Sequence, residues 1–247
     1  MEDREIRIFF GIPTVPERMA FANELANEMK IPKQNVFLDA GHNGCLWNKM
    51  RIYNHVLSCD EEYTHVCIND DDSIVCKDYT DIVQKIVKKH PKAILTFYNN
   101  SIKKAKSPYV RLKNCDLSGT AFVIPKEYLN EYNAFYMKNL ARRNFDWEET
   151  VTKMFALLND IEVILIVPNL VNVRKGLKTV ARKGNYIQPQ SVSWVHDFPE
   201  ESLNTDFIDE KGTKLFNLHL PKDHILAETC RRKFEAKKAQ FENGGSA

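Results

Sequence analysis

The sequence predicts an α/β protein in which helices flank a mostly parallel sheet, as a three-layered αβα sandwich. Apolar runs rich in β-forming residues alternate along the chain with segments of helical periodicity. Most of these runs are continuously apolar, which is typical of strands covered on both faces. Alternation of strands and helices favours parallel pairing through right-handed crossovers. We expect one domain over residues 1–242.

The expected strands share an uninterrupted apolar character: 6–12, 35–38, 64–69, 93–98, 120–124 and 162–168. The expected helices share an apolar stripe on one face: 16–30, 46–58, 79–90 and 147–158. Residues 243–247 are interpreted as a disordered end or a linker remnant.

Composition excludes few function classes. The net charge of +2 over 247 residues does not by itself require a nucleic-acid partner. A run of 18 apolar residues is missing, so we expect no membrane span. The first residues lead directly into a strand without the regions of a signal peptide, and the 6 cysteines form no Cys-x-x-Cys pair. We therefore expect reduced thiols and a cytoplasmic protein, in the host cytoplasm if it is viral.

Three consecutive aspartates, Asp70, Asp71 and Asp72, follow the expected strand 64–69. Ligands of open α/β sheets bind at the carboxyl ends of the strands. Mg²⁺ and Mn²⁺ prefer oxygen ligands and usually take one or two carboxylates plus substrate phosphates. The triplet therefore predicts a cation site, although a solvated turn before the next helix would place the same residues there.

Four segments, in this order and spacing, resemble the nucleotide-binding half of GT-A-fold glycosyltransferases: GIPTVPER (11–18), FLDAGHNG (37–44), CLWNKMRIYN (45–54) and INDDD (68–72). Further along, LSGTAFVIPKEY (117–128) and NFDWEETV (144–151) resemble the acceptor loop and the acidic motif of that fold. The resemblance covers about residues 6 to 170. It implies a donor-binding half over 6–72 and an acceptor half over 73–200, and we expect a C-terminal helical extension over 201–242.

The resemblance implies a transferase that uses Mn²⁺ or Mg²⁺ and a nucleotide-diphosphate sugar, with a UDP-sugar favoured. The residues that it assigns to the donor are Pro13, Thr14, Arg18, Asp39, Lys49, Asp70 and Asp71. Asp72 and Asp70 would bind the metal, which acts as a Lewis acid on the departing diphosphate. Each has a structural alternative: Asp39 can cap a turn, and Arg18 and Lys49 can be solvated helix charges.

The acidic motif offers a catalytic base. In inverting members of the fold the residue matching Asp146 deprotonates the acceptor, and Glu148 and Glu149 are the alternatives here. The same three acids suit a helix N-terminus, where capping is stabilising. Phe145 departs from the family pattern, and a retaining enzyme needs no such base. Gly119, Arg142, Arg143 and Trp147 are expected on the acceptor side.

Many members of the fold add a late histidine to the metal site. Val173 stands where this histidine is expected, so His196 is assigned in its place, with His219 as the alternative.

Basic residues gather in 103–113, 174–183 and 231–238, mostly in the acceptor half. Such clusters bind phosphates without reading sequence, which raises the hypothesis of a hydroxymethylated pyrimidine in DNA as acceptor. Solvated surface charge explains the same clusters. Two other functions stay open. A sugar-nucleotide nucleotidyltransferase would have a glycine-rich loop after the first strand, and residues 11–18 do not form such a motif. A non-enzymatic nucleic-acid-binding protein would leave the acidic triplet unexplained.

Overall fold

The computed structural model describes residues 5–59, 63–99, 110–113, 117–140, 148–177, 189–191 and 193–204, together with several residues between 228 and 239. A seven-stranded sheet runs through its centre in the order β2-β1-β3-β7-β5-β8-β6. The strands of this sheet are β1 (Ile8–Thr14), β2 (Val36–Leu38), β3 (His65–Asn69), β5 (Ile94–Thr96), β6 (Val110–Lys113), β7 (Ala121–Pro125) and β8 (Val163–Val167). A second, two-stranded sheet pairs β4 (Ser73–Val75) with β9 (Val171–Val173).

The central sheet is mostly parallel, as predicted. β1 pairs in parallel with β2 and β3, and β5 pairs in parallel with β8. β7 lies between β3 and β5 and is antiparallel to both, and β6 is antiparallel to β8. The register Asn69↔Ala121 places the start of β7 beside the end of β3. Residues just before β7 therefore lie at the carboxyl edge of the parallel strands.

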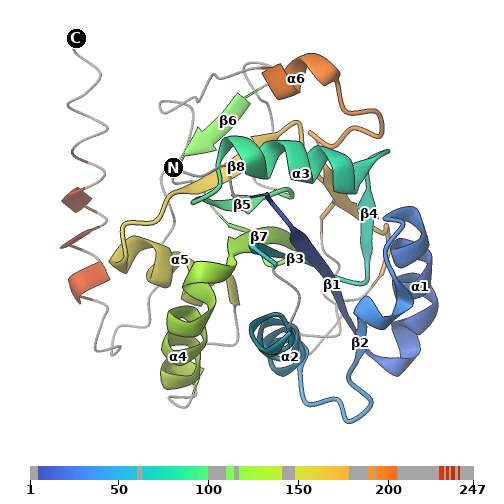
Figure 1. Cartoon of the computed structure of the whole chain (residues 1–247), viewed down its shortest axis with the longest axis horizontal. Helices are drawn as coiled ribbons and strands as arrows, with labels where there is room; N and C mark the ends of the chain where they lie inside the picture. The colour runs from blue at the N-terminus through green and yellow to red at the C-terminus, as the bar shows by residue number, and fades with distance from the viewer. Residues whose placement is uncertain are drawn as a thin grey trace.

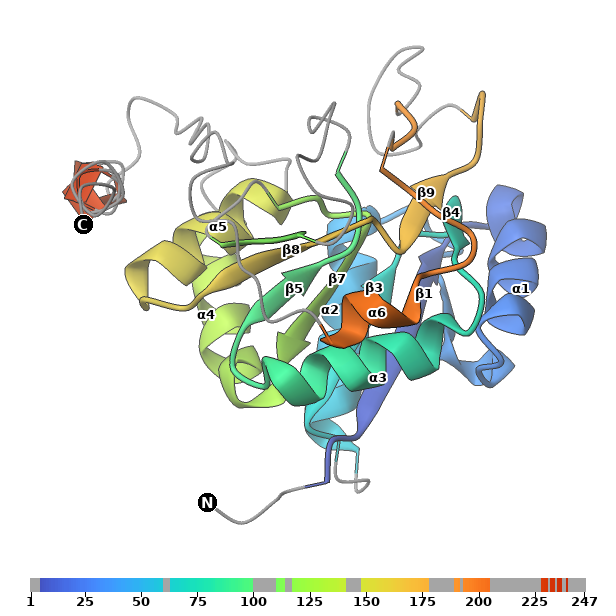
Figure 2. The same ribbon diagram turned by 90° about the horizontal axis from the view of Figure 1, so that it is seen from above.

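Helices cover both faces of the sheet, which confirms the αβα arrangement (Figures 1 and 2). α2 (Cys45–Ser58), α4 (Leu129–Leu140) and α5 (Glu148–Leu158) pack in the hydrophobic cluster that contains Phe9. α1 (Met19–Glu28), α3 (Tyr79–Lys89) and α6 (Glu200–Asn204) pack in the cluster that contains Phe10. Consecutive strand residues point to opposite faces, so the two phenylalanines of β1 enter two separate cores.

The predicted strands and helices are present, with ends shifted by a few residues. The predicted helix 16–30 begins as the 3-10 turn η1 (Pro16–Arg18) before α1, and two further 3-10 turns are η2 (Lys33–Asn35) and η3 (Lys126–Tyr128). The sequence did not predict α4, α6 or the short strands β4, β6 and β9. β2 and β5 are equally short but lie within runs of apolar, β-forming residues, whereas β4, β6 and β9 contain serine, arginine and lysine, and asparagine respectively.

The expected extension 201–242 falls largely outside the described residues. Within it, Cys230 is buried in the core cluster that also contains Leu157, and Lys233 pairs with Asp160 at 2.9 Å. Across the described helices, none combines the length and the apolar character needed to cross a bilayer.

Candidate functional site

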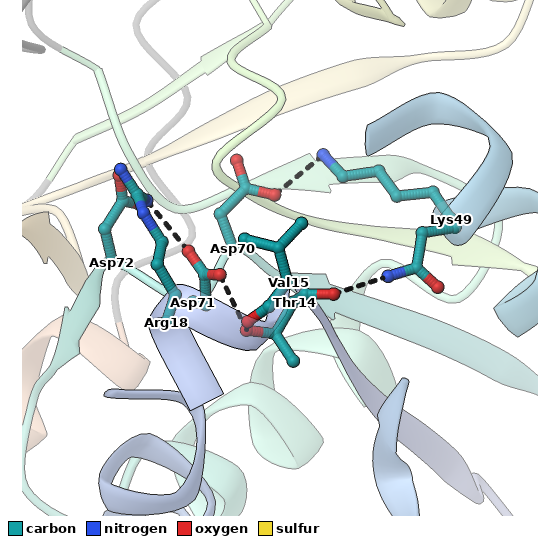
Figure 3. A network of polar contacts seen from close by, with 8 residues as sticks. Thr14, Val15, Arg18, Lys49, Asp70, Asp71 and Asp72 are labelled. Carbon is teal, nitrogen blue, oxygen red and sulfur yellow. Dashed lines mark hydrogen bonds and ion pairs between the residues drawn. The ribbon is translucent and has the colours of Figure 1, made fainter. Parts of the chain in front are cut away.

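The carboxyl ends of β1, β2 and β3 bring together the residues that the sequence analysis assigned to the donor (Figure 3). Thr14 ends β1, and its carbonyl accepts a hydrogen bond of 2.8 Å from the backbone N–H of Asp39, which follows β2. The N–H of Asp70, which follows β3, donates to the carbonyl of Thr120 at 2.8 Å. Backbone pairing therefore places three strand ends and the start of β7 around one site.

Asp71 is held from two sides in the interior of this site. Its Oδ1 accepts from Nη1 of Arg18 at 2.9 Å, and its Oδ2 accepts from the hydroxyl of Thr14 at 2.8 Å. Burial raises the pKa of Asp71, and the hydrogen bonds from Arg18 and Thr14 oppose that rise. Although burial lowers the pKa of Arg18, its bonds to the two carboxylates raise it overall, so the guanidinium stays cationic.

Asp72 shares the same guanidinium nitrogen. Nη1 of Arg18 lies 3.1 Å from Oδ2 of Asp72, and the backbone N–H of Arg174 donates to the Asp72 carbonyl at 2.8 Å. The residue is only 6 % exposed. Its second carboxylate oxygen, Oδ1, is buried and has no hydrogen-bond partner among the described residues. A carboxylate oxygen that is buried without a partner is costly unless a cation, water or ligand compensates it.

Asp70 turns away from Arg18 and faces α2 instead (Figure 3). Its Oδ1 lies 2.9 Å from Nζ of Lys49, and the same ammonium donates to the carbonyl of Gly119 at 2.7 Å. Lys49 is 2 % exposed, whereas the Asp70 side chain is 26 % exposed. Lys49 therefore joins the end of β3 to the loop before β7, and Asp70 is the most accessible of the three aspartates.

These positions overturn the solvated alternatives. Asp71 and Asp72 are buried, so the triplet is not a solvated turn. Arg18 and Lys49 are buried as well, and both cations are committed to carboxylates of the triplet. The structure thus brings five donor-assigned residues, the metal-assigned Asp72 and the acceptor-assigned Gly119 into one polar cluster: Thr14, Arg18, Lys49, Asp70 and Asp71 are the five.

Asp39 holds the turn that leads into α2. Its Oδ1 accepts from Nδ2 of Asn43 and its Oδ2 accepts from the N–H of Gly44, both at 2.9 Å. Burial raises its pKa, but the hydrogen bonds from residues 41–44 outweigh burial and lower it overall. The turn-capping alternative is therefore confirmed for Asp39. Pro13 lies opposite Phe37 in the β1–β2 ladder and contributes to the frame of the site.

The expected acceptor and catalytic residues are described only in part. Asp146, Arg142, Arg143, Trp147 and His219 lie outside the described residues. Glu148 is the first residue of α5, and Glu149 follows it with a half-buried side chain.

Among the described residues, His196 and Asp72 are not gathered into a metal-binding group. The His196 carbonyl accepts from the N–H of Lys77, beyond β4, and its Nδ1 lies 3.1 Å from Oδ2 of Asp197.

Two residues of the site received no role from the sequence, although Asn48 stands in one of the segments that carry the resemblance. Asn48 donates to the carbonyls of Thr14 and Phe37 at 3.2 and 2.6 Å, which binds α2 to β1 and β2. Arg174 follows β9, contacts Asp72 through its backbone, and pairs with Glu24 at 2.9 Å. Arg174 lies in the basic tract 174–183, which is the one sequence signal that could have identified it.

The carboxylates of the site suit a divalent cation whose remaining coordination positions are filled by water and a bound substrate. Among the described residues, no three or more His, Cys, Asp and Glu side chains are gathered as a metal-binding group. Among the residues described, Oδ1 of Asp72 is buried and lacks a hydrogen-bond partner. Mg²⁺ commonly binds proteins through one or two carboxylates and fills its other positions with water and substrate phosphates. Asp72 fits that mode.

Comparison with models of known protein families gives no match for this chain, and comparison with curated protein sequences gives none either.

Proposed function

We propose that the protein is a metal-dependent glycosyltransferase that moves a sugar from a nucleotide-diphosphate sugar, with UDP favoured, to a hydroxyl acceptor. The observation that carries the proposal is the open Oδ1 of Asp72, buried beside a guanidinium at the carboxyl end of β3. A carboxylate oxygen without a partner favours a cation, and an adjacent arginine favours an anionic ligand. A diphosphate bound through a divalent cation satisfies both.

In this proposal Asp72 holds the cation and Arg18 faces the diphosphate. The cation supplies Lewis-acid stabilisation of the leaving nucleotide diphosphate when it is bound. Asp70, which is paired with Lys49, is the accessible carboxylate, and it accepts a hydrogen bond from a ribose hydroxyl. Lys49 also donates to the Gly119 carbonyl, so one ammonium links the proposed donor side to the proposed acceptor loop.

The proposal also names a catalytic base and an acceptor. Asp146, Glu148 or Glu149 would take the proton from the acceptor hydroxyl in an inverting reaction. A hydroxymethylated pyrimidine in DNA is the acceptor that the basic tracts favour. Its test is transfer of labelled sugar to hydroxymethylated duplex with a steep salt dependence, and salt-insensitive transfer would contradict a DNA acceptor.

The proposal is tested by thermal unfolding with a panel of nucleotide sugars, with and without Mn²⁺. A ligand at 100 times its dissociation constant adds about 2.7 kcal/mol, which raises the melting temperature by about 2–4 °C per kcal/mol. We expect this shift with one nucleotide sugar and Mn²⁺ together, and we expect Asp72→Asn to abolish it.

Asp78→Asn is the matched control. Asp78 is half-exposed, pairs with Lys30 at 3.3 Å, and has a left-handed backbone that asparagine also tolerates. The control variant should keep the full ligand shift. A shift with DNA alone, and none with any nucleotide sugar, would contradict the transferase and favour a binding protein. Release of pyrophosphate in place of nucleotide diphosphate would favour a nucleotidyltransferase.

A further inference from the structure

We propose that Arg18 couples the binding of the divalent cation to the binding of the diphosphate, by occupying the cation site until the diphosphate arrives. Arg18 is then a positioning residue that keeps the empty site closed to metal alone. The inference rests on the proposed function only for its nucleotide arm, because competition between Arg18 and a cation follows from the aspartates themselves.

The carboxylates around Arg18 outnumber the positive charges that neutralise them. One nitrogen, Nη1 of Arg18, contacts Asp71 at 2.9 Å and Asp72 at 3.1 Å, so a single guanidinium serves two buried carboxylates. The third aspartate, Asp70, has its own cation in Lys49. The group formed by Arg18, Asp71 and Asp72 therefore carries one surplus negative charge. Buried charge of this kind is stabilised by a further cation.

Asp72 has fewer hydrogen-bond partners than Asp71, so it is the carboxylate that can bind a cation. Asp71 is held on both oxygens, by Arg18 and by Thr14. Asp72 is held by Arg18 at one oxygen only, and its Oδ1 is buried without a partner among the residues described. A cation entering the group would therefore bind Asp72, beside the guanidinium.

The cation bound alone and the cation bound together with a diphosphate differ in how strongly Arg18 repels the metal. A divalent cation at Asp72 changes the charge of the three-residue group from −1 to +1, and the repulsion between cation and guanidinium acts at short range and low dielectric. A diphosphate removes that repulsion, because its oxygens accept from the guanidinium and coordinate the metal at the same time. Metal alone is thus disfavoured, and metal with diphosphate is favoured. Linkage requires that each ligand tightens the other by the same factor.

Binding of Mn²⁺, followed by the loss of its free electron paramagnetic resonance signal, tests this coupling with and without UDP. In the wild type we expect weak binding of Mn²⁺ alone and at least tenfold tighter binding with UDP. In Arg18→Gln we expect Mn²⁺ alone to bind at least about tenfold tighter than in the wild type. UDP should then add less than about threefold, because the repulsion that it relieves is already gone.

Arg7→Gln is the control, since Arg7 is an exposed arginine paired with Glu5 at 2.8 Å, and it should behave as the wild type. Equal or weaker binding of Mn²⁺ alone to Arg18→Gln overturns the inference. If UDP has no effect on the wild type, the nucleotide proposal fails, while the metal-alone comparison still decides the competition.

A measurement on the wild type covers the case in which Arg18→Gln does not fold. The Nε–H resonances of ¹⁵N-labelled arginine are followed by NMR during titration with Mg²⁺, with and without UDP. We expect one slowly exchanging arginine resonance to move with Mg²⁺ and UDP together at concentrations where Mg²⁺ alone leaves it in place. Arginine resonances that stay unchanged in both titrations would overturn the inference.

Discussion

Two polar clusters lie at the same edge of the central sheet, and they differ in charge. The aspartate cluster, defined as Thr14, Arg18, Lys49 and Asp70–Asp72, lies at the ends of β1 and β3. The asparagine cluster, defined as Asn99, Asn169, Asn172, Ser191 and Ser193, lies at the ends of β5 and β8. The first contains charged side chains, whereas the second is neutral.

The asparagine cluster is satisfied by the chain itself. Oδ1 of the fully buried Asn169 accepts from the N–H of Asn99 at 3.1 Å and from the hydroxyls of Ser191 and Ser193 at 2.6 and 2.8 Å. Its Nδ2 donates to the carbonyl of Ile166 at 2.8 Å. This network holds the segment containing Ser191 and Ser193 against the sheet, so its role is structural.

The proposed ligand site and the structural network thus lie at one sheet edge and differ in whether the chain satisfies their polar groups. The neutral cluster has partners for both groups of its central side chain, and a ligand would gain little there. The aspartate cluster keeps a surplus negative charge and the open Oδ1 of Asp72. Mn²⁺ should therefore change the unfolding stability of variants in the aspartate cluster and leave that of variants in the asparagine cluster unchanged.

The largest effect is expected at Asn169. Asn169→Ala leaves a buried N–H and two hydroxyls without their acceptor, and each such loss costs about 1–3 kcal/mol. We expect a loss of about 4 kcal/mol in the free energy of unfolding, measured by urea denaturation, that Mn²⁺ does not restore. Asn159→Ala, at an exposed asparagine, should cost under about 1 kcal/mol. Recovery with metal would remove the distinction between the clusters.

Arg18→Gln should come next. Removing one partner of a buried ion pair costs about 3–5 kcal/mol, and the shared nitrogen places this variant near the lower value. Here Mn²⁺ should restore part of the stability, since a cation can replace the lost charge. The measurement is thermal unfolding with and without Mn²⁺, with Arg7→Gln alongside. A variant as insensitive to Mn²⁺ as Asn169→Ala would show that the two clusters do not differ in this respect.

Asp39→Asn tests the turn that precedes α2 and should cost about 1 kcal/mol at neutral pH, because the carboxylate accepts from Asn43 and from the N–H of Gly44. Because the folded pKa of Asp39 is lowered from its ordinary value of 3.8, its contribution is present above that value and is lost as the pH falls through the folded pKa. The stability difference between wild type and variant should therefore shrink in acid. Asp197→Asn, at an exposed aspartate, is the control. A difference that does not change with pH would contradict the carboxylate as the capping group.

The smallest effect concerns His65, at the start of β3 and away from both clusters. Burial lowers its pKa from the ordinary 6.5, although its Nε2, 2.9 Å from the carbonyl of Pro91, opposes the shift. The unfolded chain then takes up the proton first, so stability is complete above pH 6.5 and falls as the pH drops toward the folded pKa. His65→Gln should flatten this dependence in urea unfolding between pH 7 and pH 5. An unchanged slope would exclude His65 as its source.

Local sequence determined the fold class and the place of the aspartates. The apolar runs that became β1, β3 and β8 are recognisable because a strand buried on both faces needs apolar residues at successive positions. The Asp-x-Asp position followed directly, since it succeeds such a run. The helices α1, α2, α3 and α5 were recognisable in the same way from their stripes.

Only the tertiary structure decided how the site is connected. The partners Thr14 and Asp71 lie 57 residues apart, and Lys49 and Gly119 lie 70 apart. The antiparallel insertion of β7 between β3 and β5 brings Gly119 to the edge that holds the aspartates, and no local pattern encodes it. Periodicity reports which face of an element is buried, whereas the sharing of Arg18 between two aspartates depends on how distant elements pack. That packing turned residues that read as solvated charges into a buried cluster in which, among the described residues, Oδ1 of Asp72 lacks a hydrogen-bond partner.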